Sequence, residues 1–201
     1  LGRVRPDRLS GGLEDTGLIG AGGGWGLRKA CQQVKAWRAG GAANFRVAVN
    51  LSPRQLGETG LADRVQQILS EVGLPPDALE LEITESSLLD HEEQAIAVLH
   101  ELKGLGVSLA MDDFGTGFCS FTYLKHLPVD TLKIDGTFVQ GLAGSPVDQA
   151  MVNSMNQVAH ALGKRTIAES VENEATLILL KEIGVDYAQG HFLGRPAAML
   201  N

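Results

Sequence analysis

The sequence predicts an α/β fold in which parallel strands close, or nearly close, into a barrel. Six short apolar runs each end in a polar or charged residue, and segments with helical periodicity separate them. No linker or low-complexity stretch interrupts this order. Strict alternation of helices and strands implies a parallel sheet with the helices outside it. The length, 201 residues, is most simply one domain over residues 1–201.

Helical segments are recognised by apolar residues that recur on one stripe, and most of them end at a glycine or a proline. In the second segment this stripe is Leu61, Val65, Ile68, Leu69 and Val72, followed by Gly73. The predicted helices are residues 25–40, 61–72, 91–105, 118–127, 148–162 and 174–183. The residues before 25 are rich in glycine and contain no strand-like run.

The apolar runs between the helices are the predicted strands. They are residues 46–50, 79–82, 107–113, 131–135, 165–169 and 187–189. A closed barrel of this class has eight strands. Either part of the barrel is missing on the N-terminal side of these six runs, or the sheet is open.

The polar ends of these runs carry most of the chemistry of the chain. In a parallel barrel the carboxyl ends of the strands meet at one rim, where active sites are built. A core needs only the apolar part of each run, so the acids need another explanation. The side chains expected at this rim are Asn50, Glu82, Glu85, Asp112, Asp113, Lys133, Asp135, Glu169, Glu172 and Gln189.

The sharpest local motif is Asp-Asp-Phe-Gly-Thr-Gly at residues 112–117. Because side chains alternate along a strand, Asp112 and Asp113 can both point inward only if the strand stops there. Adjacent carboxylates repel and raise one another's pKa unless a cation holds them. The alternative is that these two acids cap the following helix.

Lys133 lies between Leu132 and Ile134, where a lysine is costly unless it faces a polar centre. Among clustered acids it could position a water molecule or a phosphate oxygen. Oxygen ligands from several strands suit Mg²⁺ or Mn²⁺ rather than zinc. Two such ions are the usual device for in-line hydrolysis of a phosphodiester. Taken singly, each acid has a simpler explanation, such as a solvated strand end.

Several other function classes find no support. Cys31 and Cys119 have no metal-ligand or disulfide spacing, and no order of Ser, His and Asp suggests covalent catalysis. A net charge of −7 argues against a long nucleic-acid partner. No apolar stretch reaches the roughly 18 residues that span a bilayer, and the start of the chain lacks a signal-peptide core. We expect a cytoplasmic protein whose present segment makes no membrane contact.

Several segments resemble the EAL-domain family of bacterial cyclic-di-GMP phosphodiesterases. They are EDTGLI, ACQQVKAW, VAVNLSPRQL, LELEITES, LAMDDFGTGFCSFTYLKHLPVDTLKID, TIAESVEN and AQGHFLGRP, in family order between about Gly12 and Pro196. The resemblance implies a modified TIM (β/α) barrel whose first one or two strands are absent from this chain. It also implies hydrolysis of cyclic-di-GMP to linear pGpG with two Mg²⁺ or Mn²⁺ ions, as part of bacterial second-messenger signalling.

The resemblance also assigns roles to residues. The implied metal ligands are Asn50, Glu82, Asp112, Asp113 and Glu169. Lys133 would hold the attacking water and act in catalysis with Asp113, Glu169 and Glu85. Glu85 would anchor the loop at 112–117, near which the family forms a homodimer. The implied substrate-binding residues are Gln189, Asp135 and Arg195.

The sequence departs from the family pattern at several places. The Glu-Ala-Leu segment, with a metal-ligand glutamate and a substrate-binding arginine, would lie upstream of Leu1 and is absent. Gly136 replaces a basic residue, Ser170 replaces a glycine, and Phe118-Cys119 stands where Tyr-Ser is usual. We therefore expect an N-terminally incomplete phosphodiesterase domain with weak activity or none by itself. The alternatives are a non-catalytic cyclic-di-GMP receptor and a dimerisation module.

Overall fold

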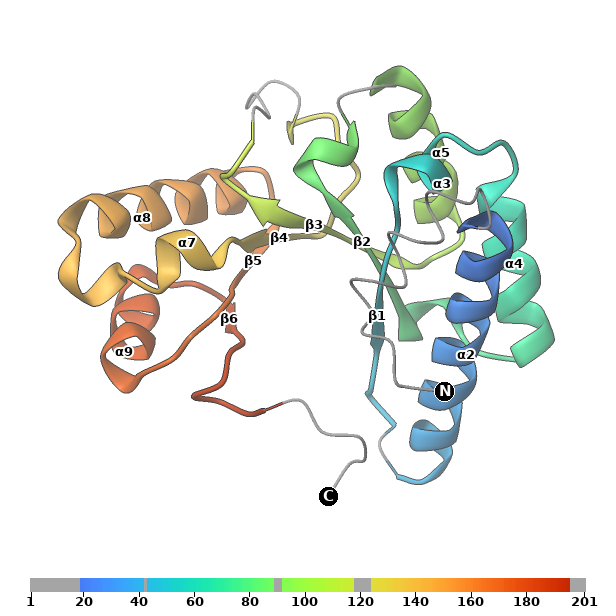
Figure 1. Ribbon diagram of the computed structural model, residues 1–201, viewed down its shortest axis with the longest axis horizontal. Helices are drawn as coiled ribbons and strands as arrows, with labels where there is room; N and C mark the ends of the chain where they lie inside the picture. The colour runs from blue at the N-terminus through green and yellow to red at the C-terminus, as the bar shows by residue number, and fades with distance from the viewer. Residues whose placement is uncertain (1–18, 42, 89–91, 118–123, 196–201) are drawn as a thin grey trace, which may run out of the picture. The chain divides into compact units, whose positions relative to one another are not determined.

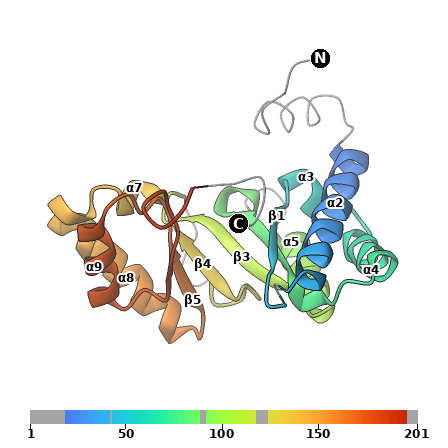
Figure 2. The same cartoon turned by 90° about the horizontal axis from the view of Figure 1, so that it is seen from below.

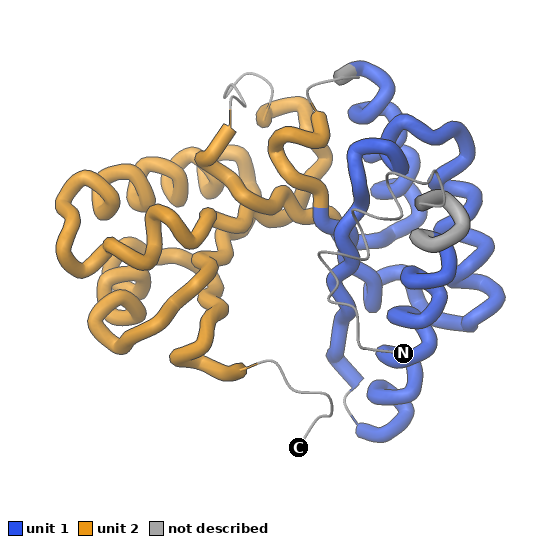
Figure 3. The backbone as a smooth tube through the Cα atoms, viewed as in Figure 1, with its two compact units in different colours: residues 1–82, 90–108 blue, residues 83–89, 109–201 orange. Residues whose placement is uncertain are grey.

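The computed structural model describes residues 19–41, 43–88, 92–117 and 124–195, which form two compact units. Unit 1 comprises residues 1–82 and 90–108, and unit 2 comprises residues 83–89 and 109–201 (Figure 3). Among the described residues, at least one helix separates each strand from the next except between the third and fourth strands, whose connection lies partly outside the described residues, and all the strand pairs described below are parallel. Elements are numbered as in Figure 1.

Unit 1 contains several helices and a pair of parallel strands. Val47 of β1 is opposite Leu79 of β2, and Asn50 is opposite Glu82. Helix α2 lies beside α4 and packs against β1 (Figure 1). The elements are α2 (Ile19–Ala39), β1 (Val47–Asn50), α3 (Pro53–Leu56), α4 (Leu61–Val72), the 3₁₀ turn η1 (Pro76–Ala78), β2 (Leu79–Thr84), whose last two residues belong to unit 2, and α5 (Glu92–Gly104).

Unit 2 carries the remaining strands. β3 pairs with β4, β4 with β5, and β5 with β6. Helix α8 packs on β4 and β5, and α9 packs beside α8 (Figures 1 and 2). The elements are η2 (Glu85–Leu88), β3 (Ser108–Phe114), β4 (Thr131–Ile134), α7 (Gly136–Val139), η3 (Leu142–Gly144), α8 (Pro146–Ala161), β5 (Arg165–Ala168), α9 (Glu174–Ile183) and β6 (Tyr187–Ala188).

The core of unit 2 lies between these strands and helices. Its fully or almost fully buried members come from β4, β5, the helices packed against them and the connection between β5 and α9: Ile134, Val139, Leu142, Val152, Ala168, Val171 and Leu180. Burial of an aliphatic side chain contributes about 1.5–3 kcal/mol. This packing fixes β4 and β5, and therefore the residues that follow them at their carboxyl ends.

The predicted bounds of two helices are confirmed, because one face of each is buried. α4 buries its predicted stripe and ends at Gly73, which has φ 68° and donates its N–H to the carbonyls of Leu69 and Ser70. α9 also has its predicted bounds, and its end has the same geometry at Gly184. Left-handed glycines are favourable helix ends because they lack a Cβ.

Other predicted bounds were wrong. α2 begins at Ile19 rather than at residue 25, since packing against α4 outweighs the low helix propensity of its glycines. β2 continues to Thr84 and β6 ends at Ala188. The short α3 was not predicted from periodicity; it is held by Ser52 and Gln55, whose side chains each accept from the other's backbone N–H. Most of the predicted helix at 118–127 lies outside the described residues.

The prediction that the third strand stops at Asp113 is also wrong. β3 continues to Phe114, and its register with β4 shifts between Met111 and Phe114. Asp113 has a positive φ of 55° at this irregularity. A bulge of this kind re-aims a side chain, which is how a strand can contribute two adjacent acids to one cluster.

None of the helices in the described part of the chain is both long enough and apolar enough to span a membrane.

Candidate functional site

Three acids of unit 2 form the centre of the candidate site. Asp112, Asp113 and Glu169 each offer one carboxylate oxygen, and these oxygens lie within 4.8 Å of one another. Asp112 and Asp113 belong to β3, and Glu169 directly follows β5. Oxygen donors at this spacing fit a hard divalent cation such as Mg²⁺ or Mn²⁺. The acids that the sequence placed at strands three and five therefore do come together.

Lys133 lies among these acids on β4, the strand between β3 and β5. Its side chain is almost fully buried, and Nζ is 3.0 Å from Asp112 Oδ1 and 2.8 Å from Glu169 Oε1. A buried lysine faces a polar centre, as its place within an apolar strand predicted. Its positive charge offsets part of the negative charge of the cluster.

Asp113 has an unusual proton affinity. Partial burial is the main cause that raises the pKa of its carboxyl above the ordinary value of 3.8, and the negative charges of Asp112 and Asp135 raise it further. The ammonium of Lys133 opposes this shift without reversing it. A carboxyl of this kind gains from a nearby cation, because metal binding favours the ionised form.

Glu85 holds the turn that follows the acidic pair. The residue is 5% exposed, and its Oε2 accepts hydrogen bonds from the N–H groups of Gly115 at 3.3 Å and Gly117 at 3.1 Å. A Cβ added at Gly117 would lie 2.9 Å from the Glu85 carboxyl carbon. Glycine is therefore required for this close approach. A catalytic role of Glu85 itself stays a prediction.

Asp135 has a structural task at the end of β4. Its Oδ1 accepts hydrogen bonds from Thr137 N at 2.9 Å and from Thr137 Oγ1 at 2.5 Å, which caps the N-terminus of α7. Such caps typically contribute about 1 kcal/mol. The contact with substrate that the resemblance implies for Asp135 stays a prediction.

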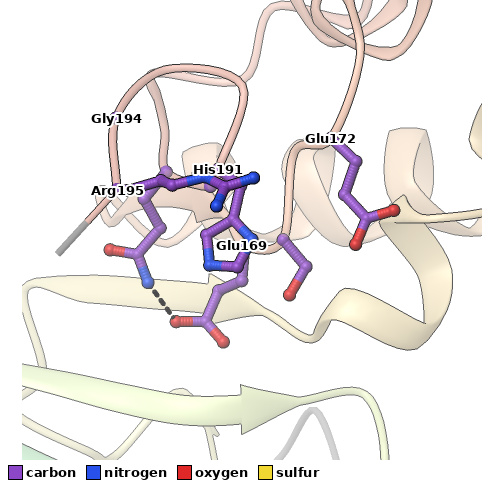
Figure 4. A pocket seen from close by; sticks show the side chains of 8 residues that line it. Glu169, Glu172, His191, Gly194 and Arg195 are labelled. Atoms are coloured by element: carbon purple, nitrogen blue, oxygen red, sulfur yellow. Dashed lines mark hydrogen bonds between the residues drawn. The ribbon is translucent and has the colours of Figure 1, made fainter.

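A cavity of about 640 Å³ adjoins Glu169 (Figure 4). This volume is in the range of ligand pockets, about 300–1,000 Å³. Glu169 belongs to both the cavity lining and the acidic cluster. Gln189 Nε2, also in the lining, donates a hydrogen bond to Glu169 Oε1 at 2.5 Å. Two predicted substrate residues, Gln189 and Arg195, line the cavity. The full lining is Glu169, Ser170, Glu172, Gln189, Gly190, His191, Gly194 and Arg195.

Asn50 and Glu82 lie in unit 1, where they are opposite one another in the β1–β2 pair. Glu82 is buried and Asn50 is exposed. The backbone carbonyl of Glu82 accepts a hydrogen bond from Leu51 N at 2.8 Å. Their proximity agrees with the predicted alignment of the first two strand ends. Their roles as metal ligands stay predictions.

Ser170 is a cavity residue that the sequence did not single out for function. It has a positive φ of 55°, and its side chain lies against Gly136. The available signal was that both positions depart from the family pattern. Their contact could not be foreseen, because residues 136 and 170 follow different strands and only the packed structure brings them together.

Comparison with known proteins identifies the family of the chain. A model of the EAL domain family matches residues 1–196. The bifunctional diguanylate cyclase/cyclic di-GMP phosphodiesterase MucR of Pseudomonas aeruginosa is 40% identical over 195 residues, which are 97% of this chain and 28% of MucR. The cyclic di-GMP phosphodiesterase NbdA of the same organism is 38% identical, over 97% of this chain and 25% of NbdA. The chain thus spans about a quarter of the length of these curated relatives.

A solved structure gives the same result for the fold. The phosphodiesterase PaMucR in complex with c-di-GMP superposes with a TM-score of 0.90 at 39% identity, over 96% of this chain and 78% of that chain. This likeness confirms the predicted α/β fold class. Together with the family match over residues 1–196, it establishes that the chain belongs to the EAL domain family.

Proposed function

We propose that the protein hydrolyses one phosphodiester bond of cyclic-di-GMP and releases linear pGpG. The observation that carries this proposal is the cluster of Asp112, Asp113 and Glu169 around the buried Lys133. The ligand-sized cavity beside Glu169 and the phosphodiesterase names of MucR and NbdA support it. Bound c-di-GMP in the PaMucR structure supports the choice of substrate.

Asp112, Asp113 and Glu169 are the residues that would hold Mg²⁺ or Mn²⁺, because they present only hard oxygen donors. When bound, ions of this class lower the pKa of a coordinated water and stabilise negative charge on a phosphoryl group. The family resemblance implies two ions. Asn50 and Glu82 are proposed as further ligands on that resemblance alone.

In this proposal Lys133 holds the acidic side chains of the cluster in place. Its ammonium fixes the carboxylates of Asp112 and Glu169 in one orientation, so that their lone pairs are directed before a ligand arrives. The same positive charge can orient a water molecule or a phosphoryl oxygen at the cluster. A cation in this position can favour turnover over mere binding, because the negative charge that the phosphodiester already carries in the ground state increases on the phosphoryl oxygens in the transition state.

Arg195 and Gln189 would bind the dinucleotide from the cavity. The guanidinium of Arg195 offers paired donors that match a phosphate. The Gln189 amide, which already donates to Glu169, connects the bound substrate to the acidic cluster. Asp135 is proposed as a third substrate residue on the family resemblance, in addition to its role as a helix cap.

Replacement of Asp112 by Asn tests this proposal. The variant keeps the size of the side chain but removes the charge, so we expect pGpG formation to fall below detection while cyclic-di-GMP binding is retained in part. Asp63→Asn is the matched control, because Asp63 is an exposed acid on α4. Product is followed by chromatography and binding by calorimetry. If the full-length protein binds cyclic-di-GMP with Mg²⁺ present but forms no pGpG, the receptor alternative replaces the enzyme.

We also propose a homodimer formed near the loop at 112–117, on the family resemblance, and a cytoplasmic location, on the sequence features that predicted it. Sedimentation of the protein at increasing concentration tests the first. A monomer at all concentrations, with and without cyclic-di-GMP, would exclude the dimer.

A further inference from the structure

The connection between β5 and α9 holds Ser170 in a strained backbone conformation next to Glu169. Within the described ranges, the non-glycine residues with positive φ are Asp113 and Ser170, both at 55°. This conformation brings the Cβ of an L-residue close to the following carbonyl, so glycine is favoured there. Strain of this kind persists where surrounding contacts impose it, often at functional sites. Asp113 is part of the acidic cluster, and Ser170 needs its own explanation.

Both neighbours of Ser170 are fixed by backbone hydrogen bonds. Glu169 N donates to Ile134 O on β4 at 3.1 Å, and Val171 N donates to Gln189 O at 3.0 Å. Val171 is fully buried, and Gly190 approaches it so closely that a Cβ at position 190 would overlap the Val171 backbone. The left-handed conformation of Ser170 is therefore imposed from both sides.

The Ser170 side chain fills the space next to Gly136, the first residue of α7. A Cβ added at Gly136 would lie 2.5 Å from Ser170 Oγ and 2.8 Å from Ser170 Cβ. Contacts below 3.0 Å essentially never occur for a real Cβ, so something would have to shift. The space between residues 136 and 170 therefore holds only one side chain, and in this protein it is the side chain of Ser170.

We propose that Ser170 and Gly136 are a complementary pair that positions Glu169. The Ser170 side chain sets the distance between the β5–α9 connection and the start of α7. The tip of Glu169 is held by Lys133 and Gln189, and the pair holds its backbone. This inference rests on the proposed function, which gives Glu169 its task at the cluster. Ser170 and Gly136 are positioning residues in this scheme, since they act through Glu169.

Three variants test the pair in the full-length protein. Gly136→Ala adds a methyl group where Ser170 already lies, and Ser170→Gly leaves the space empty. The double variant moves one small side chain from one side of the contact to the other. We expect each single change to lower kcat for cyclic-di-GMP about 10- to 100-fold with a smaller change in KM, because misplaced catalytic groups cost this much. We expect the double variant to regain most of that loss.

Melting temperatures without metal separate positioning from stability. Ser170→Gly removes a left-handed serine, so its melting temperature should equal or exceed that of the parent although its kcat falls. Gly136→Ala should melt lower, and the double variant should recover. Gly144→Ala is the matched control, because no atom lies within 4 Å of the Cβ it adds. Gly144→Ala should change neither the melting temperature nor kcat.

Ser170→Gly with parental kcat, or a double variant no better than the single ones, would overturn the proposal. These two variants decide the matter even if Gly136→Ala does not fold. If the parent forms no pGpG, the proposed function fails, but the pair is still tested by Mg²⁺ affinity and metal-free melting temperature. A double variant whose Mg²⁺ affinity and melting temperature both exceed the values expected from the sum of the two single effects supports the pair, and strictly additive effects overturn it.

Discussion

At the scale of single residues, the acidic cluster depends on Lys133. Three carboxylates lie within 4.8 Å of one another, and the ammonium contacts two of them. The side chain of Lys133 is only 7% exposed, so little water is available to replace it. Removal of one partner of a buried ion pair leaves the other charge uncompensated, which is far more costly than loss of a surface pair.

Lys133→Met should therefore destabilise the metal-free protein by about 3 kcal/mol. The free energy of unfolding in urea measures this loss. Mg²⁺ should restore part of it, because an ion can take over the charge that the lysine supplied. Lys29→Met, at an exposed position of α2, is the control and should change the stability little. Equal losses in the two variants would show that Lys133 does not hold the cluster together.

The raised pKa of Asp113 predicts how metal binding depends on pH. A metal ion binds the ionised carboxylate, so Mg²⁺ affinity should fall as the pH falls through this raised pKa. The metal-free protein behaves oppositely: protonated Asp113 contributes stability below the ordinary pKa, and this stability is lost as the pH rises through the raised one. Calorimetric titration with Mg²⁺ at several pH values checks the first effect. Asp113→Asn should flatten the profile, and a profile that it leaves unchanged would assign the titration to another group.

At the scale of elements, β5, β6 and α8 are joined by a polar network at the amino end of β5. Asp186 Oδ2 accepts a hydrogen bond from Thr166 N at 2.8 Å and lies 2.9 Å from His160 Nε2. Thr166 Oγ1 in turn donates to Asn156 Oδ1 at 2.6 Å. Burial raises the pKa of the Asp186 carboxyl, but its hydrogen bonds with His160 and Thr166 outweigh burial and leave the pKa lowered.

Asp186→Asn should accordingly cost about 1 kcal/mol at neutral pH. A carboxyl with a lowered pKa contributes stability above its ordinary pKa of 3.8 and loses it as the pH falls through the lowered value. The difference between variant and parent in urea unfolding should thus shrink toward zero as the solution becomes strongly acidic. A difference that does not depend on pH would mean that the charge of Asp186 contributes nothing.

At the scale of the whole molecule, the sequence predicted regular elements well where one face is buried. The stripe of α4 and the alternate buried residues of β5 are examples, and β4 is buried along its whole length, which accounts for its continuous apolar run. α3 and α7 each span only four residues and owe their bounds to a cap or a turn, so periodicity could not find them. The glycines of α2 led to a predicted helix that is too short at its N-terminus. Packing against α4 stabilises the helix in spite of their low helix propensity.

The candidate site was also predictable only in part. Asp112, Lys133 and Glu169 come from consecutive parallel strands, so their strand positions alone implied that they meet. The positive φ of Asp113, the cap made by Asp135 and the contact between Ser170 and Gly136 depend on backbone angles and side-chain packing. No spacing in the sequence reveals those. The assignment of residues 1–201 to one incomplete domain stays a prediction.

The most direct test of the proposed mechanism is to measure whether cyclic-di-GMP hydrolysis requires a divalent metal ion. Full-length protein stripped with EDTA is incubated with cyclic-di-GMP, and pGpG is measured before and after Mg²⁺ or Mn²⁺ is added. We expect no product without the ion, product after its addition, and loss of product when EDTA is returned in excess. pGpG formed at the same rate in EDTA would contradict a reaction that depends on Asp112, Asp113 and Glu169 as metal ligands.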